Sequence, residues 1–265
     1  MMSDSKQVQQ RNPSVVRNPS LYYEKILTVD YCRKLEQDTR KAQPEDLQQS
    51  LLHEKLSKLS LDNQEISESL KDRRRRLLKS FHGVFDQTLV VSHYLLVGSG
   101  RPSVFDVGFT FMRNYGVPYI PSSAFKGAFS HYVKSELSDD NLLKREFRNV
   151  FGEDASAEDD HVRGSIVFLD VIPERYRLGI DIINNHFQSY YMDDKGAYAP
   201  NDYYNPIPVQ YLVVERGSAF RFSVISKNPL EKELKHVINR ELITFLCSYG
   251  IGAKTAYGYG LFREQ

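Results

Sequence analysis

The stretch GIGAKTAYGYG, residues Gly250–Gly260, lies near the end of a chain of 265 residues and separates two predicted elements of the C-terminal part of the fold. Apolar side chains recur at helical spacing over residues 230–247, directly before this stretch, and residues 259–262 at its end predict a short strand. The glycine-rich stretch therefore predicts a bend that leads from a helix into the last strand of a sheet.

The segments before this bend extend the pattern to a mixed fold. Further helices are predicted from Ser122 or Ser123 onward, after Pro121, and at about residues 140–151. Strands are predicted at residues 87–97, 105–112, 164–171, 177–183, 209–214 and 219–226. We expect the last two strands to pair as a hairpin through Arg216 and Gly217. The order predicts an α+β fold, with a ferredoxin-like, RRM-type core in which an antiparallel sheet is backed by helices, with insertions.

The first third of the chain has a different character. Residues 1–20 are polar and contain two prolines, which predicts a disordered tail. Residues 21–82 predict a helical N-terminal segment with an apolar stripe, and residues 83–265 the α+β domain. The stripe consists of Leu47, Leu51, Leu52, Leu56 and Leu59.

Two charged runs have alternative interpretations. Arg73–Arg76 is expected to be a solvated helix face, or alternatively a patch that contacts phosphate. Residues 153–160 are acidic and are expected to form a solvated loop, because their carboxylates lack the spacing of a calcium-binding loop.

Composition restricts the possible functions. The formal net charge is +1, from 35 basic and 34 acidic residues, so binding to a nucleic acid would require charges that gather on one face. Cys32 and Cys247 match no zinc or redox spacing and favour a reduced, cytoplasmic protein. We expect no metal, no cofactor, no signal peptide and no membrane span.

The glycine-rich stretch resembles a phosphate-binding loop only in part. A P-loop requires glycine directly before its lysine, but Ala253 precedes Lys254, and a P-loop leads from a strand into a helix. Nucleotide hydrolysis is therefore not expected. Gly250 and Gly252 could instead let an RNA backbone approach, with Lys254 and Thr255 bonding to phosphate oxygens.

The tyrosines of this stretch have two possible roles. Tyr257 and Tyr259 could stack on bases or sugars. Alternatively, Gly250 caps the preceding helix and the tyrosines complete the hydrophobic core.

The start of the helix after Pro121 carries similar chemistry. Ser122, Ser123, Lys126 and Gly127 lie in its first turns, where a helix N-terminus attracts anions. Glycine inside a helix costs about 1 kcal/mol relative to alanine, so Gly127 predicts close approach of another chain or tight packing of the helix on the sheet.

These motifs resemble those of a known family. The stretches Ile120–Phe129 (IPSSAFKGAF) and Gly250–Phe262 (GIGAKTAYGYGLF) are similar to the helix start and the C-terminal glycine-rich loop of RAMP proteins, the Cas7-like subunits of type III CRISPR complexes. Four further stretches resemble subunit six of the Cmr (type III-B) complex: residues 95–121, 164–174, 181–191 and 201–214. The chain departs from the family pattern at two places. The arginine that often follows the glycine of the helix start is absent, and Phe129 and Ser130 stand there instead. The proline that usually precedes the histidine is replaced by Asn185, before His186.

The resemblance implies an RNA-binding structural subunit without catalytic activity. Such a subunit caps the backbone of the complex near the 3′ end of the guide RNA and holds guide and target RNA in antiviral defence. Its protein partners would be the Cas7-like backbone subunit, the small helical subunit and the other terminal RAMP subunit. The RNA-binding residues expected on this basis are Lys126, Ser122, Ser123, Gly127, Gly250, Gly252, Lys254, Thr255, Tyr257, Arg101, Arg113 and His186.

An endoribonuclease that acts on guide or target RNA is the alternative. Related RAMP proteins cut RNA with a histidine beside the glycine-rich loop, and His186 would be the candidate general base here. Asp106 would be the candidate for metal-dependent cleavage.

Overall fold

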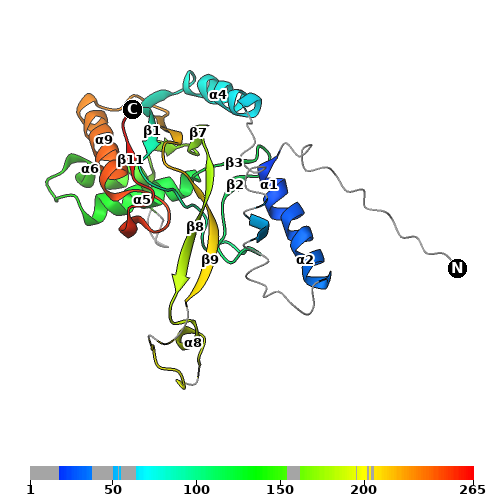
Figure 1. Cartoon of the computed structure of the whole chain (residues 1–265). Coiled ribbons are helices and arrows are strands. Elements are labelled where there is room, and N and C mark those ends of the chain that lie inside the picture. The colour runs from blue at the N-terminus through cyan, green and yellow to red at the C-terminus, as the bar shows by residue number, and fades with distance from the viewer. Residues whose placement is uncertain are drawn as a thin grey trace.

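A computed structural model describes residues 18–37, 50–52, 54, 64–153, 162–194, 196–201, 203 and 206–265 (Figure 1). Of the predicted disordered tail, residues 1–20, the first 17 lie outside these ranges, as does most of the acidic run at residues 153–160. Residues 18–20 contradict that prediction, because Asn18 caps the helix Pro19–Leu21, and Pro19 and Ser20 are buried. In the described ranges, no helix combines the length and the apolar character needed to cross a membrane.

An antiparallel sheet forms the centre of the molecule. Its strands are β1 (His82–Val91), β6 (Ile166–Phe168), β7 (Ile172–Arg175), β10 (Ala219–Ser226) and β11 (Phe262–Arg263). They lie in the order β11-β1-β10-β6, with β7 also paired to β10. This arrangement confirms the predicted α+β class with an antiparallel sheet backed by helices.

One face of the sheet is covered by helices. These are α5 (Ser122–Ser135), the short helices α6 (Leu142–Arg145) and α7 (Phe147–Phe151), and α9 (Lys232–Thr244), which continues as a π-helix, η3 (Phe245–Tyr249). Phe125 of α5 meets Phe168 of β6 and Phe222 of β10 edge to face, with ring centroids 4.9 and 5.3 Å apart. Edge-to-face pairs of this kind are favourable beyond the area that they bury. The predicted helices at residues 122 and 230–247 are thus confirmed, and the one at residues 140–151 is split into α6 and α7.

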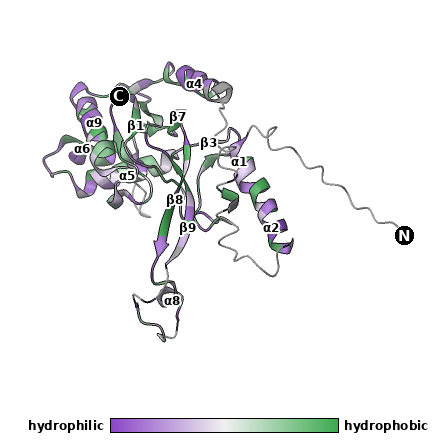
Figure 2. Ribbon diagram, in the orientation of Figure 1, coloured by the Kyte–Doolittle hydropathy of each residue, from purple (hydrophilic) through white to green (hydrophobic). Residues whose placement is uncertain are grey.

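The opposite face of the sheet is crossed by α4 (Gln64–Leu78), at the top of Figure 1. Successive side chains of a strand point to opposite faces, and Ser223, which follows Phe222, accepts a hydrogen bond from Arg74 of α4 at 3.2 Å. Beside it, Arg221 donates two hydrogen bonds to Asp86 of β1, at 2.9 and 2.6 Å. This side is therefore polar, and Figure 2 shows α4 as mainly hydrophilic.

The N-terminal helices pack against the loop that follows β1. Helices α1 (Pro19–Leu21), η2 (Tyr22–Ile26) and α2 (Leu27–Gln37) contact this loop, which contains the two short strands β2 (Phe111–Met112) and β3 (Val117–Pro118). The ring of Tyr23 stacks on that of Phe105 with centroids 5.3 Å apart. Within residues 21–82, which were predicted to be helical, the described parts are helical up to Leu78, whereas residues 79–81 are not helical and β1 begins at His82. Of the predicted leucine stripe, Leu51 and Leu52 are buried, and the other members lie outside the described ranges.

A long hairpin projects from this body. Strands β8 (Leu178–Asn185) and β9 (Ile207–Val214) pair along their full length, and α8 (Gln188–Tyr191) lies at the far end (Figure 1). The predicted pairing of residues 209–214 with residues 219–226 is therefore wrong. The tight turn at Arg216–Gly217 does exist, but β10 continues into the central sheet beside β1, with Ala219 opposite Val90.

Other predicted boundaries also shift. The strand predicted at residues 87–97 begins at His82 and ends at Val91, after which only Leu95 makes an isolated bridge, to Val214. The strand predicted at residues 105–112 is reduced to β2, and the last strand begins at Phe262 rather than Tyr259. The short strands β4 (Gly152–Glu153) and β5 (Val162–Arg163) and the 3-10 turn η4 (Thr255–Tyr257) were not predicted.

Candidate nucleic-acid interface

The glycine-rich loop is held tightly against the segment after β1. The backbone N–H of Gly260 donates to the carbonyl of Tyr94 at 2.7 Å, and that of Ala253 to the carbonyl of Leu96 at 2.8 Å. A methyl group at Gly260 would lie 1.9 Å from the carbonyl oxygen of Ile251. These glycines therefore allow the chain to approach itself, and several of the amides expected to face an anion are bonded within the protein.

Gly250 caps the preceding helix, which was the alternative interpretation of this glycine. It ends η3 with φ +77°, and its N–H donates to the carbonyl of Phe245 at 2.9 Å. Gly252 is different, because it is exposed and stands close to the carbonyl of Leu96. Gly250 is thus a helix cap, and Gly252 allows the loop backbone to lie close to the carbonyl of Leu96.

Lys254 points inward rather than to solvent. Its ammonium donates a hydrogen bond to the hydroxyl of Tyr211 in β9, and it lies 4.3 Å from the centre of that ring. The hydroxyls of Tyr211 and Tyr259 both donate to the carboxylate of Asp181 in β8. We call Asp181, Tyr211, Lys254 and Tyr259 the hairpin-base cluster, because they join the glycine-rich loop to the base of the β8–β9 hairpin.

Burial shifts the pKa of two members of this cluster, Lys254 and Tyr211. It lowers the pKa of Lys254 below its ordinary value, and the Asp181 carboxylate opposes that shift. Burial, followed by Asp181, raises the pKa of the Tyr211 hydroxyl. Lys254 thus fixes the loop on the hairpin. It is not the solvent-facing cation that the sequence analysis expected.

The two tyrosines of the loop face different surroundings. Tyr259 is 7% exposed and belongs to the core, whereas Tyr257 is 82% exposed. Thr255 is half-buried at the start of η4. Tyr257 is therefore the residue of this loop that can offer a ring face to a base.

The start of α5 lines a groove of about 760 Å³, which we call the α5 groove. Its walls are Ser122, Ser123 and Lys126 on one side and β6 with the segment after β10 on the other. Arg163 and Lys227 also line it, and no carboxylate does so within the described part of the chain. The sequence analysis missed both of these cations, because they lie far along the chain from the helix start.

The helix start itself is less open than expected. The carboxylate of Asp170 accepts the backbone N–H of Ser122 at 2.7 Å, so a residue of the protein already occupies this point of the N-terminus. The ammonium of Lys126 donates to the carbonyl of Phe151 at 2.7 Å. Gly127 is exposed, and a methyl group there would meet nothing within 4 Å. Tight packing of α5 on the sheet therefore does not explain Gly127. The other interpretation, close approach of another chain, stays a prediction.

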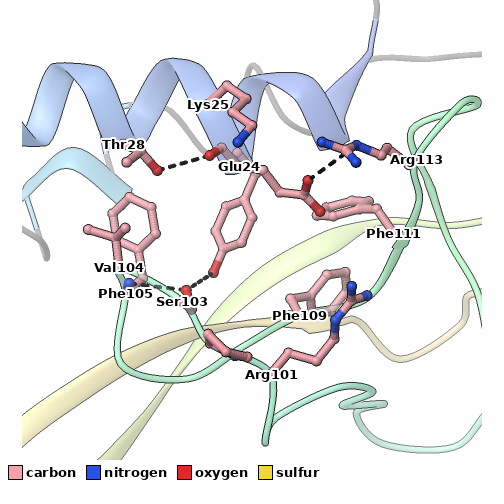
Figure 3. A pocket seen from close by; sticks show the side chains of 12 residues that line it. Glu24, Lys25, Thr28, Arg101, Ser103, Val104, Phe105, Phe109, Phe111 and Arg113 are labelled. Carbon is pink, nitrogen blue, oxygen red and sulfur yellow. Dashed lines mark hydrogen bonds and ion pairs between the residues drawn. The ribbon is translucent and has the colours of Figure 1, made fainter.

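Arg101 and Arg113 are brought together at a second pocket (Figure 3). This pocket has a volume of about 300 Å³ and an aromatic lining that includes Phe109 and Phe111. Arg113 forms a long ion pair of 4.0 Å with Glu24 of η2 and stays largely exposed. Lys25 also lines the pocket, so its lining has three cations and, from Glu24, one carboxylate within the described ranges, a net positive charge that favours an anionic ligand.

His186 lies on the projecting hairpin, beyond the end of β8. It is exposed, and its ring lies 6.4 Å from that of Phe187. The histidine that does lie beside the glycine-rich loop is His93, whose ring is 5.7 Å from that of Tyr259. No sequence pattern pointed to His93 as a site residue, because it lies within residues 87–97, which were predicted to form an uninterrupted strand.

The hairpin tip carries exposed aromatic side chains that the sequence analysis did not select. Tyr191 is 69% exposed and Tyr203 is 89% exposed, and Tyr190 and Tyr198 are also exposed. Flat exposed rings are the usual stacking partners of unpaired bases.

Comparisons with known proteins identify the family. The sequence profile of the RAMP superfamily matches residues 88–263. The Cmr6 subunit of the CRISPR Cmr system of Pyrococcus furiosus is 30% identical, over 71% of this chain and 70% of that relative. The Cmr6 subunit of Saccharolobus solfataricus is 25% identical, over 93% of this chain and 80% of that relative.

One solved structure shares the fold. A chain from the cryo-EM structure of the type III-B Cmr-beta complex bound to cognate target RNA matches with a TM-score of 0.62 and 22% identity, over 85% of this chain and 76% of that chain. The family expected from residues 120–129 and 250–262 is thereby confirmed. The chain belongs to the RAMP superfamily and, within it, to the Cmr6 family.

Proposed function

We propose that the chain is an RNA-binding subunit of a type III-B CRISPR effector that holds guide and target RNA without cutting it. Its relatives are named as subunits of the Cmr system, and a chain of similar fold comes from a Cmr complex bound to target RNA. On this proposal it caps the backbone near the 3′ end of the guide RNA. It would contact the Cas7-like backbone subunit, the small helical subunit and the other terminal RAMP subunit.

The observation that carries the proposal is the charge of the α5 groove. Among the described residues, Lys126, Arg163 and Lys227 line it and no carboxylate does, and hydroxyls of Ser122 and Ser123 stand beside them. Cations and hydroxyls bind phosphate and sugar without reading bases, which suits a protein that has to accept any guide sequence. The chain as a whole has a net charge of only +1, so this local excess arises from the fold.

The α5 groove can be tested with a charge-matched pair of variants. Arg163→Ala/Lys227→Ala removes two groove cations, and Lys232→Ala/Lys235→Ala removes two exposed cations of α9 that do not line it. Binding of labelled single-stranded RNA is measured by fluorescence anisotropy over a salt series. The groove variant should lose about 1.4 from the slope of log K against log salt, at about 0.7 for each phosphate contact.

The outcome should not depend on RNA sequence. Equal loss of affinity is expected for RNAs of unrelated sequence, because phosphates carry no base information. Wild-type affinity and slope in the groove variant would contradict the proposed interface.

The hairpin tip provides a second kind of contact on this proposal. Stacking of a base on an aromatic side chain is worth about 1–3 kcal/mol. Tyr190→Ala/Tyr191→Ala should therefore weaken RNA binding while the melting temperature stays unchanged, because both rings are exposed. An unchanged affinity would remove the tip from the interface.

The nuclease alternative has its own test. His93 lies beside the glycine-rich loop, His186 is at the hairpin, and Asp106 is exposed with φ +55°. We expect the purified chain to leave RNA intact with and without divalent metal ions. Metal-free cleavage that His93→Ala or His186→Ala abolishes, or metal-dependent cleavage that Asp106→Ala abolishes, would establish the enzyme instead.

A further inference from the structure

The four consecutive arginines of α4 have three different environments. Arg74 is buried, and its guanidinium donates to the hydroxyl of Ser223 and to the backbone carbonyl of Asp170. Arg75 is exposed and pairs with Asp72 at 2.8 Å, one turn earlier on the helix. Arg73 and Arg76 are also exposed but line a groove, since residues three apart share one helix face. The run is therefore neither a uniformly solvated face nor a uniform patch.

The groove beside Arg73 and Arg76 has a volume of about 620 Å³, and we call it the α4 groove. Helix α4 forms one wall, and the β2–β3 hairpin and the β6–β7 connection form the other. Its floor is apolar and aromatic, with Leu70 and Ile172 buried and Met112 and Tyr115 half-buried. A ligand that fills this groove needs both a negative charge and a flat or apolar part.

The charges in the α4 groove are unbalanced. The carboxylate that lines it belongs to Asp170, and that carboxylate accepts the backbone N–H of Ser122. Arg73 bonds to the neutral hydroxyl of Tyr115 at 3.5 Å, and within the described ranges no carboxylate pairs with Arg73 or Arg76. Two neighbouring like charges without an acidic partner form a favourable site for an anion.

Asp170 connects the walls of the two grooves. Its carboxylate accepts the backbone N–H of Ser122, where α5 begins, and its carbonyl accepts Arg74 of α4. Phe168 at the end of β6 lines the α5 groove, and Leu169 and Asp170, the next two residues, line the α4 groove. Because β6 lies at the edge of the sheet, an RNA strand would pass from one groove to the other around this edge.

We propose that the α4 groove binds a segment of single-stranded RNA, with phosphates at Arg73 and Arg76 and a base against Tyr115 and Met112. The planar guanidinium group forms paired hydrogen bonds with phosphate, and unstacked bases favour aromatic and apolar surfaces. The inference rests on the proposed function, because this RNA would be a continuation of the strand held in the α5 groove. It assigns a role to Arg73 and Arg76 that the packing of α4 does not explain, since Arg74 is the one of the four arginines that is buried.

The test uses the arginine run as its own control. Arg73→Ala/Arg76→Ala removes the two exposed cations of the groove and keeps the buried Arg74, and Arg75→Ala/Lys79→Ala removes two cations of the same helix region that do not line the groove. The full-length chain is titrated with labelled single-stranded RNA long enough to span both grooves, over a salt series. The groove variant should bind about tenfold more weakly, with a slope smaller by about 1.4, and the control should stay close to wild type.

The outcomes separate this inference from the proposed function. Wild-type RNA binding by Arg73→Ala/Arg76→Ala, beside impaired binding by Arg163→Ala/Lys227→Ala, would overturn the inference and leave the proposed function standing. Equal impairment of the groove variant and of Arg75→Ala/Lys79→Ala would also overturn it, because the effect would then be one of net charge.

Direct binding experiments distinguish RNA from an acidic protein segment. Labelled poly-glutamate and labelled single-stranded RNA are each titrated into the wild-type chain and the α4-groove variant. If the variant loses affinity for poly-glutamate and keeps wild-type affinity for RNA, the groove is a site for acidic protein and the inference fails. Loss of RNA affinity in the variant, beside weak and equal binding of poly-glutamate by both chains, supports RNA. The melting temperatures of both variants should match that of the wild type, since neither replaces the buried Arg74.

Discussion

Replacing Gly260 by alanine tests whether the glycine-rich loop depends on a close approach of its own backbone. Gly260 has φ +66°, and a methyl group there would lie 1.9 Å from the carbonyl oxygen of Ile251. Gly258, in the same loop, has φ +82°, but nothing lies within 4 Å of the corresponding position. The two substitutions share a backbone penalty and differ in the available space.

The expected costs follow from these two features. A left-handed conformation costs a non-glycine residue about 1–2 kcal/mol, which is the whole expected effect of Gly258→Ala. At Gly260 the obstacle is backbone and has to move, which strains the hydrogen bonds of Gly260 N–H to Tyr94 (2.7 Å) and of Ile251 N–H to Gly260 (3.0 Å). At roughly 0.5–1.5 kcal/mol each, their loss brings the total for Gly260→Ala to about 2–5 kcal/mol.

Equilibrium unfolding in urea, followed by circular dichroism, measures this difference. Both variants should show lower midpoints than the wild type, with Gly260→Ala clearly the less stable and the slope m unchanged. A melting curve gives a second readout, with about 2–4 °C lost for each kcal/mol in a domain of this size. Equal destabilisation by the two variants would refute the reasoning, because the close contact would then contribute nothing.

Three further predictions concern the charged groups. Burial opposes ionisation of Asp86, but hydrogen bonds from its arginine and serine partners hold its pKa below the ordinary value. The ionised carboxylate therefore stabilises the folded state at neutral pH, and this contribution is lost as the pH falls through the folded-state pKa. Asp86→Asn should therefore reduce the free energy of unfolding at pH 7 by roughly 1–3 kcal/mol and flatten its acid dependence in urea titrations from pH 7 to pH 3. Arg74→Ala should lower the melting temperature because it removes hydrogen bonds to the buried Ser223 hydroxyl and to the part-buried carbonyl of Asp170, whereas Arg75→Ala should leave it nearly unchanged; equal shifts would contradict the assignment of Arg74 as the anchor. Asp181→Asn should lower the pKa of Lys254 further, seen by NMR titration of the Lys254 side chain, and an unchanged pKa would mean that the two groups are not coupled.

Sequence patterns predicted the elements whose stabilising contacts are periodic and local. The helix beginning at Ser122 and the one over residues 230–247 were located because their apolar residues recur at helical spacing. The pairing of residues 209–214 was predicted wrongly, because a tight turn at Arg216–Gly217 normally joins paired strands. Here each strand on either side of that turn pairs with a different strand, β9 with β8 and β10 with β1.

The candidate site was predicted in its parts but not in its assembly. Ser122, Ser123 and Lys126 do line one groove, but Arg163 and Lys227 complete it from distant segments. No spacing rule connects such residues, since only the pairing of β6 with β10 brings their segments together.

Local patterns in the chain were sufficient to predict the family and the α+β class, because the two RAMP-like motifs and the helical periodicity depend on neighbouring residues alone. Which charged side chains are available for binding depends on the folded structure. Lys254 turns toward Asp181 and Tyr211, and the arginine run divides into a buried anchor, an exposed ion pair and two groove residues. The physical reason is that the environment of a charge depends on burial and on partners from distant strands, and the order of residues does not encode these directly.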